Sequence, residues 1–191
     1  MATVDVELPA VVAAIRAASA PGGMTTRFVA VDGPGGAGKS SLAAWLAAEL
    51  EAPVIHTDDF ASWENPVNWW PQLIRDVLVP LAAGKPARYQ PTNGARELVV
   101  EPSDFVVLEG VTASREAFRP YLAYSIWIET PRELRLRRGL ERDGEQALAD
   151  WERWMTGEDR YVERERPAEH ADCVLRGDRG MWTSEEGRST C

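Results

Sequence analysis

The 191-residue sequence predicts an α/β fold in which a parallel five-stranded sheet is covered by helices on both faces. Short apolar runs rich in β-branched residues alternate along the chain with longer segments of helix-forming residues. Such alternation is typical of strand–helix–strand units, whose strands are parallel and buried on both faces. Polar residues with catalytic or ligand-binding chemistry follow three of the apolar runs, at the strand ends where such sheets bind ligands.

The first of these polar segments matches the phosphate-binding loop pattern G-x-x-x-x-G-K-[ST] without a mismatch. An apolar run at residues 28–31 precedes it, and a helix-forming run at residues 41–50 follows it. Glycines let successive backbone N–H groups turn toward one concavity at the helix N-terminus, where phosphate oxygens bind. A glycine-rich turn that matches by chance is the alternative. The residues expected to bind ATP are Gly33, Gly35, Gly36, Ala37, Gly38, Lys39, Ser40 and Ser41.

Within this loop, Lys39 is expected to reach the β- and γ-phosphates, and the hydroxyl of Ser40 to ligate Mg²⁺. ATP and Mg²⁺ are therefore the expected cofactors.

The first half of the chain is expected to contain three helices, including the one at residues 41–50 after the loop, and two strands. Residues 8–18 have the spacing of a helix, so residues 1–25 are interpreted as an N-terminal helix and linker. Strands are expected at residues 28–31 and 53–56. Residues 66–83 predict a helix with Pro71 near its first turn and Gly84 after its end.

The second half continues the alternation with strands at residues 105–108, 124–128 and 172–175. Thr130 is placed as a helix N-cap, with a proline at the first helical position. The charged stretch from about 131 to 166 is helical in character and is interpreted as a lid and the helix after it. Residues 177–191 form a polar tail that we expect to be loosely ordered. Residues 1–191 are expected to form a single domain.

The net charge of −9 argues against nucleic acid as the main partner, because phosphate backbones require a basic surface. No apolar run approaches the roughly 20 residues that span a bilayer. The N-terminus lacks a basic segment followed by an apolar stretch, so no signal peptide is expected. These features predict a cytoplasmic protein without a membrane partner. The oligomeric state is left open, with a homodimer as one option.

Two carboxylate positions complete the predicted catalytic set. Asp58 and Asp59 follow the strand at residues 53–56, where a carboxylate can accept the proton of an acceptor hydroxyl. Asp58 is the expected base and an additional metal neighbour; helix capping or a solvated turn is the alternative. Glu109 ends a fully apolar strand and is expected to bind Mg²⁺ with Ser40. An ion pair at the sheet edge is the alternative for Glu109.

An arginine-rich segment supplies cations near the predicted lid. Arg135, Arg138 and Arg142 are spaced three and four residues apart, so they share one helix face. Such a face can close over the phosphates; Arg138 is expected to act in catalysis, and Arg135 and Arg142 to contact the nucleotide. Ordinary surface ion pairs with neighbouring acidic residues are the alternative, and these add less than about 1 kcal/mol each.

Together these features resemble the uridine kinase-like branch of the phosphate-loop kinases, over about residues 27–176. The opening Val31 to Ser40 also looks like that of cytidylate kinases. Asp58-Asp59-Phe60 is similar to the branch's Asp-x-Phe-Tyr, Val107-Leu108-Glu109-Gly110 to its strand with the metal-linked glutamate, and Arg135-Leu136-Arg137-Arg138 to its lid helix. By that match Asp58 aligns with the catalytic aspartate. The resemblance implies a P-loop NTPase fold and transfer of the γ-phosphoryl group of ATP to a hydroxyl of a small molecule, most readily a uridine- or cytidine-like nucleoside.

The acceptor region departs from this family. Ala61 stands where the family has tyrosine, and its histidine-containing acceptor pocket has no clear counterpart. Aromatic residues crowd the region instead, and they either stack on a planar acceptor or pack under an irregular loop. The residues expected to contact the acceptor are Asp59, Phe60, Trp63, Trp69, Arg88 and Tyr89.

Other functions are open alternatives. A nucleoside monophosphate kinase, or a kinase acting on a vitamin or an antibiotic hydroxyl, would use the same loop. A nucleotide-binding regulatory protein without transfer activity is a third alternative. A GTP-dependent switch is disfavoured, because the chain has no Asn-Lys-x-Asp motif.

Overall fold

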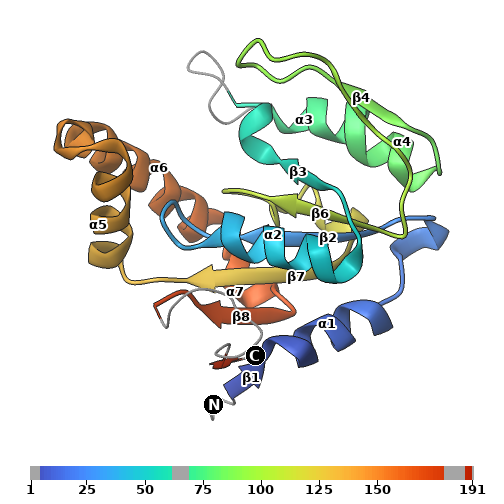
Figure 1. Cartoon of the computed structure of the whole chain (residues 1–191), viewed down its shortest axis with the longest axis horizontal. Helices are drawn as coiled ribbons and strands as arrows, with labels where there is room; N and C mark the ends of the chain where they lie inside the picture. The colour runs from blue at the N-terminus through green and yellow to red at the C-terminus, as the bar shows by residue number, and fades with distance from the viewer. Residues whose placement is uncertain (1–4, 62–68, 179–187, 191) are drawn as a thin grey trace.

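The computed structural model describes residues 5–61, 69–178 and 188–190 (Figure 1). Its centre is a five-stranded sheet in the order β3-β6-β2-β7-β8, with every neighbouring pair parallel. The predicted α/β fold with five parallel strands is therefore confirmed. The five strands are β2 (Arg27–Asp32), β3 (Val54–His56), β6 (Phe105–Glu109), β7 (Leu122–Glu129) and β8 (Cys173–Arg176).

The central strand β2 is buried on both faces because its alternate side chains enter two separate cores. Phe28 and Ala30 lie in one core, and Val29 and Val31 lie in the other. Burying one such large apolar side chain contributes about 1.5–3 kcal/mol. A strand with this environment must be apolar at every position, which is why the sequence shows a continuous run rather than an alternating one.

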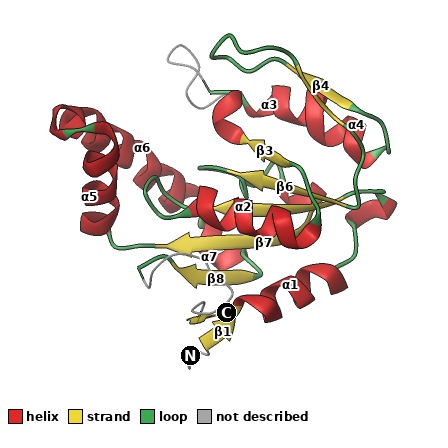
Figure 2. Ribbon diagram, in the orientation of Figure 1, coloured by secondary structure: helices red, strands yellow, loops and turns green. Residues whose placement is uncertain are grey.

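Helices complete both cores, as predicted (Figure 2). The core with Val29 and Val31 is closed by α1 (Leu8–Ala17) and α2 (Lys39–Leu50). The core with Phe28 and Ala30 is closed by α3 (Trp70–Leu73), the π-helical turn η3 (Ile74–Leu78) and α4 (Val79–Ala82). Pro80 has no N–H to donate to the Asp76 carbonyl, and the π-helical turn lies where that bond is missing. Residues 66–68 of the helix predicted there lie outside the described residues.

The stretch at 131–166, interpreted from the sequence as a lid and the helix after it, contains two main helices. Helix α5 (Arg132–Asp143) ends at Gly144, and the short turn η5 (Glu145–Ala147) leads into α6 (Leu148–Glu165). Gly144 adopts a φ of 87°, a conformation that glycine tolerates best. Helix α7 (Pro167–His170) then leads to β8.

The predicted N-cap role of Thr130 is wrong. Helix α5 begins without a side-chain cap, after Pro131 in an extended conformation. The hydroxyl of Thr130 instead donates to the carbonyl of Ala37 in the phosphate loop, 3.2 Å away. The hydroxyl reaches this distant carbonyl because the end of β7 lies beside the loop, and its oxygen accepts no hydrogen bond from an N–H of the first helical turn.

Four short strands were not predicted. Strands β4 (Ala87–Tyr89) and β5 (Leu98–Val100) form an antiparallel pair. Strands β1 (Asp5–Glu7) and β9 (Arg188–Thr190) form another, so this part of the tail expected to be loosely ordered is paired. Strands of only three residues are too short to carry a distinctive sequence pattern. None of the described helices is long and apolar enough to cross a membrane.

The indole of Trp151 on α6 separates two glycines, one on α5 and one in the phosphate loop. A Cβ added at Gly139 would overlap the indole, and one added at Gly35 would lie 3.1 Å from it. Trp151 is only 8% exposed. Glycine at both positions therefore lets the two lid helices and the loop meet around one large side chain.

We expect Gly139→Ala to lower the free energy of unfolding by about 1–3 kcal/mol, because the added methyl overpacks Trp151. Urea denaturation measures this change. Gly157→Ala is the matched control, since Gly157 lies in helix α6 and a Cβ there meets open space. The control should be neutral or stabilising by up to about 1 kcal/mol through helix propensity. Equal effects at both positions would contradict the packing argument.

Candidate active site

The phosphate loop connects the end of β2 to the first turn of α2. Gly36 has a φ of 73°, and a Cβ there would lie 2.6 Å from the backbone oxygen of Arg135. Gly38 has a φ of 103° and precedes the first residue of α2. Both positions therefore require glycine, one for conformation and close approach, the other for the turn into the helix. Lys39 Nζ donates across the loop to the carbonyl of Pro34 at 3.0 Å.

Glu109 lies at the end of β6 between a hydroxyl and an imidazole. Ser40 Oγ donates to Glu109 Oε1 at 3.2 Å, and His56 Nδ1 donates to Oε2 at 2.7 Å. Burial alone would raise the pKa of Glu109, but the hydrogen bond from His56 and the charge of Lys39 outweigh it and hold the pKa below its ordinary value. The pKa of His56 is raised, chiefly by its hydrogen bond to Glu109 and against the effect of burial.

These oxygens fit Mg²⁺. The Ser40 hydroxyl and an ionised Glu109 carboxylate are hard oxygen donors beside the phosphate loop. Mg²⁺ commonly takes only one or two protein ligands and completes its shell with water and substrate phosphates. No cluster of three acidic, histidine or cysteine ligands that could hold a metal ion occurs in the described part of the chain.

His56 was not predicted as a functional residue. Strand register places it directly beside Glu109 on the neighbouring strand. The available sequence signal was its position as the last residue of an apolar strand, immediately before the acidic pair.

The structure places the two aspartates after β3 in different surroundings. Asp58 lies in the turn η2 (Thr57–Asp59) and lines the same cleft as Lys39. Burial raises the pKa of Asp58, although the nearby charge of Lys39 opposes that effect. Asp59 instead accepts a hydrogen bond from the Tyr89 hydroxyl at 3.0 Å. Asp58 is thus the carboxylate that faces the cleft.

The cleft itself has a volume of about 770 Å³, within the usual range for small-molecule sites. The phosphate loop forms one side, α5 and α6 form the other, and the ends of β3 and β6 lie between them. The predicted site residues that line it are Gly35, Gly36, Gly38, Lys39, Ser40, Ser41, Asp58, Glu109, Arg138 and Arg142. Gly33 and Ala37 belong to the loop but are not among the residues lining the cleft.

Two of the three lid arginines reach this cleft. Arg138 donates to the carbonyls of Gly36 at 3.2 Å and Gly177 at 2.9 Å. Arg142 pairs with Asp143 at 2.8 Å. The pKa of Arg142 is raised, first by the hydrogen bond to Asp143 and in part by the charge of Asp58. Arg142 is therefore close enough to the expected base to feel its charge.

Arg135, predicted to contact the nucleotide, lies instead in a buried ion pair behind the loop. Its guanidinium is 3.0 Å from Glu158 Oε2, and the two side chains are 7% and 3% exposed. Glu158 Oε1 also accepts a hydrogen bond from the Gly35 N–H at 2.6 Å. The physical reason is that a buried arginine requires a counter-charge, which α6 supplies from 23 residues further along the chain.

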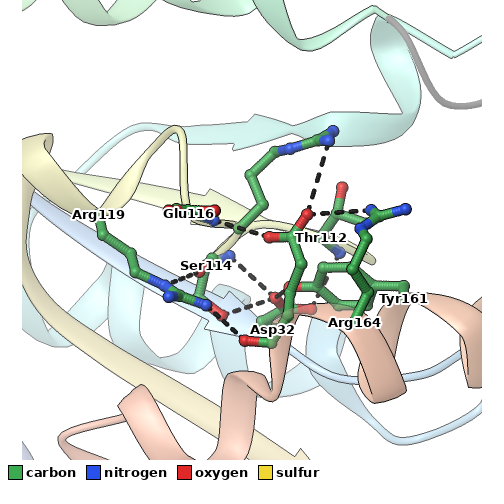
Figure 3. A network of polar contacts seen from close by, with 9 residues as sticks. Asp32, Thr112, Ser114, Glu116, Arg119, Tyr161 and Arg164 are labelled. Atoms are coloured by element: carbon green, nitrogen blue, oxygen red, sulfur yellow. Dashed lines mark hydrogen bonds and ion pairs between the residues drawn. The ribbon is translucent and has the colours of Figure 1, made fainter.

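Asp32 is a second residue that the sequence reasoning missed. It is fully buried at the end of β2 and accepts hydrogen bonds from three segments (Figure 3). The donors are the N–H groups of Gly33 (2.7 Å), Thr112 (3.0 Å) and Ser114 (2.9 Å), and the hydroxyls of Ser114 (2.7 Å) and Tyr161 (2.6 Å). The signal in the sequence was a carboxylate directly after an apolar strand, as at Glu109.

The aromatic residues predicted for the acceptor pocket belong mainly to the core. Phe60, Trp69 and Tyr89 are 1%, 5% and 4% exposed, and the Phe60 ring stacks on Tyr89 with centroids 4.7 Å apart. This arrangement matches packing rather than contact with a planar acceptor. Arg88 is exposed and 3.6 Å from Glu97. Trp63 lies outside the described residues.

Comparison with known proteins identifies the fold. No protein-family model and no curated protein matches the chain. A Bacillus stearothermophilus protein described as a possible uridine kinase matches with a TM-score of 0.64 and 20% identity, over 87% of this chain and 95% of its own. A Silicibacter sp. TM1040 protein described as a candidate fructose transport system kinase matches with a TM-score of 0.55 and 21% identity, over 88% and 98%. The chain has the fold of the P-loop kinases.

Removing one partner of the buried pair should be costly. We expect Glu158→Ala to lower the free energy of unfolding by about 3–5 kcal/mol, because it leaves Arg135 buried without a counter-charge. Asp159→Ala is the control, since it breaks the exposed 2.8 Å pair with Arg132 between the same two helices. That pair should contribute less than about 1 kcal/mol. Chemical denaturation measures the free energy of unfolding of both variants. Similar losses of stability would contradict the expected larger contribution of the buried pair.

Proposed function

We propose that this chain is an ATP- and Mg²⁺-dependent kinase that phosphorylates a hydroxyl of a small molecule, most readily a nucleoside of the uridine or cytidine type. The observation that carries the proposal is the position of Asp58. A carboxylate with a raised pKa lines the same cleft as Lys39 and the phosphate-loop glycines. A structural neighbour that is described as a possible uridine kinase supports the choice of acceptor.

In the proposed reaction, backbone N–H groups of the loop hold the phosphates of ATP, and Lys39 stabilises the charge that develops on them. Asp58 accepts the proton of the acceptor hydroxyl while the hydroxyl oxygen bonds to the γ-phosphorus. The bond between that phosphorus and the bridging oxygen to the β-phosphate breaks, and ADP leaves. A raised pKa suits Asp58 to this task, because it brings the carboxylate closer to the basicity of a general base at neutral pH.

Ser40 and Glu109 are the residues that would hold Mg²⁺, with Asp58 as a neighbour, and the bound metal supplies charge neutralisation at the phosphates. His56 holds the second oxygen of Glu109 and thereby orients the carboxylate toward Ser40. Arg138 and Arg142 bring positive charge to the lid side of the same cleft.

ADP release tests the proposed activity directly. Wild-type protein with Mg·ATP is assayed against nucleosides, nucleoside monophosphates, vitamins with a free hydroxyl and hydroxylated antibiotics. We expect release of ADP with one class of acceptor, and a product whose mass exceeds that of the acceptor by one phosphoryl group. Lys39→Ala should abolish this transfer, because it removes the positive charge that Lys39 places at the β- and γ-phosphates. Tight ATP binding without ADP release for any acceptor would point to the regulatory alternative; full activity in Lys39→Ala would overturn the proposed site.

Substitutions of Asp58 and Asp59 should have different effects on turnover. We expect Asp58→Asn to lower kcat by about 10²–10⁴-fold, the usual contribution of a general base, while ATP still binds. In wild type, the acidic limb of kcat/KM should lie above the ordinary aspartate pKa of 3.8, because Asp58 must be deprotonated and burial raises its pKa.

Asp59→Asn is the matched control for this pair. It should keep the turnover and the pH profile, since Asp59 is hydrogen-bonded to Tyr89. If Asp59→Asn were inactive and Asp58→Asn active, the general base would be Asp59.

A further inference from the structure

One face of helix α6 carries both residues that attach the helix and residues that line the cleft. Its residues Glu158 and Tyr161 attach the helix to the phosphate loop and to Asp32. One and two turns earlier, Asp150, Trp151 and Trp154 line the cleft. These five positions share one side of the helix by their spacing. The C-terminal half of this face therefore attaches the helix to the phosphate loop and Asp32, and the N-terminal half is available to contact a ligand in the cleft.

Trp154 has no structural role that accounts for it. Its side chain is 42% exposed, and it makes no hydrogen bond or ring contact with another residue that the structure describes. Trp151 differs, because its indole is wedged against Gly35 and Gly139 and its Nε1 donates to Asp143 at 2.9 Å. A large exposed indole on the wall of a cleft is a surface on which a planar ring can stack.

Asp150 places a carboxylate one helical turn from Trp154 on the same wall. Its partner is Arg153 at 3.3 Å, with side chains 64% and 73% exposed, and such a surface pair holds the carboxylate only weakly. An ionised carboxylate accepts hydrogen bonds and cannot donate them. This wall is therefore suited to a ring that carries an N–H donor, and is poorly suited to one that presents a carbonyl there.

The wall and the proposed base line the same cleft. Arg142 lies over the ring of Trp151, with 5.6 Å between guanidinium and ring centroid, and feels the charge of Asp58. The acceptor must meet Asp58, whereas the phosphates of ATP occupy the loop from Gly36 to Ser41. A ring attached to the acceptor hydroxyl thus has Trp154 and Asp150 within the same cleft.

We infer that Trp154 and Asp150 form the ring-binding wall of the acceptor site. The acceptor ring stacks on the Trp154 indole, and an amino group on the ring donates to Asp150. This inference rests on the proposed kinase function and narrows its substrate class to hydroxyl compounds with an amino-substituted planar ring.

Cytidine and uridine are matched probes of the same size: cytosine presents an amino group at C4 beside an unprotonated N3, whereas uracil presents a carbonyl at C4 beside an N3–H. We expect wild type to phosphorylate cytidine with the higher kcat/KM. Trp154→Ala should raise the KM for cytidine by about 10- to 100-fold, the range of base–aromatic stacking, and leave the KM for ATP unchanged. Trp154→Phe should restore most of the loss. Leu148→Ala is the control, since Leu148 is 40% exposed on the same helix and does not line the cleft.

Asp150→Ala should bring the kcat/KM for cytidine down toward that for uridine. The kcat/KM for uridine itself should change little. Asp159→Ala, another exposed acidic residue of α6, is its control. Binding of cytidine in the presence of Mg·ADP, measured by equilibrium dialysis, gives the same comparison without turnover and should weaken in Trp154→Ala.

Three outcomes would overturn the inference. An increase in the KM for ATP without a change for cytidine in Trp154→Ala would assign the wall to the nucleotide. A wild-type preference for uridine would overturn the role of Asp150. Failure of wild type both to bind and to phosphorylate either nucleoside would overturn the wall, and ADP release with another acceptor would then show that the kinase proposal itself still stands.

Discussion

The buried carboxylate of Asp32 is the constraint on which the site's architecture depends. A fully buried carboxylate is costly unless donors surround it, and here five donors from three segments do so. Satisfying it fixes the start of the phosphate loop, the segment after β6 and helix α6 relative to one another. Thr112 donates one of these bonds from a φ of 73°, a conformation that β-branched residues rarely adopt. The network thus holds a strained backbone next to the cleft.

The phosphate loop is also held by side chains from distant parts of the chain. Its Gly35 N–H is bound by Glu158, and its Gly36 and Ala37 carbonyls are bound by Arg138 and Thr130. These partners all come from the end of β7 and the two lid helices. The base of the lid is therefore attached to the loop, and the N-terminal half of the α6 face is the part left to meet ligands. The lid arginines looked interchangeable in sequence, but Arg135 lies in the buried pair with Glu158, Arg142 lines the cleft, and Arg138 both lines the cleft and binds the loop.

The parallel sheet explains why the expected base and metal ligands meet. Strands β3 and β6 are neighbours in register, so His56 lies beside Glu109, and Asp58 follows His56 by two residues in the turn η2. The carboxyl ends of parallel strands share one edge, which brings residues from 53 positions apart within hydrogen-bonding distance. Burial at that edge then raises the pKa of Asp58, while hydrogen bonds lower that of Glu109. Two carboxylates of the same cleft thereby acquire different proton affinities.

The sequence by itself determined the five parallel strands, the phosphate loop and the cleft positions of Asp58 and Glu109. Each depends on a local pattern, namely a continuous apolar run, a glycine-rich motif, or a carboxylate directly after a strand. Only the tertiary structure decided the partners of Thr130, Arg135 and His56 and the burial of Phe60. Those partners lie far along the chain, 93 residues away for Thr130. A local pattern indicates that a polar or aromatic side chain needs a partner, but packing of the whole chain decides which partner lies within reach.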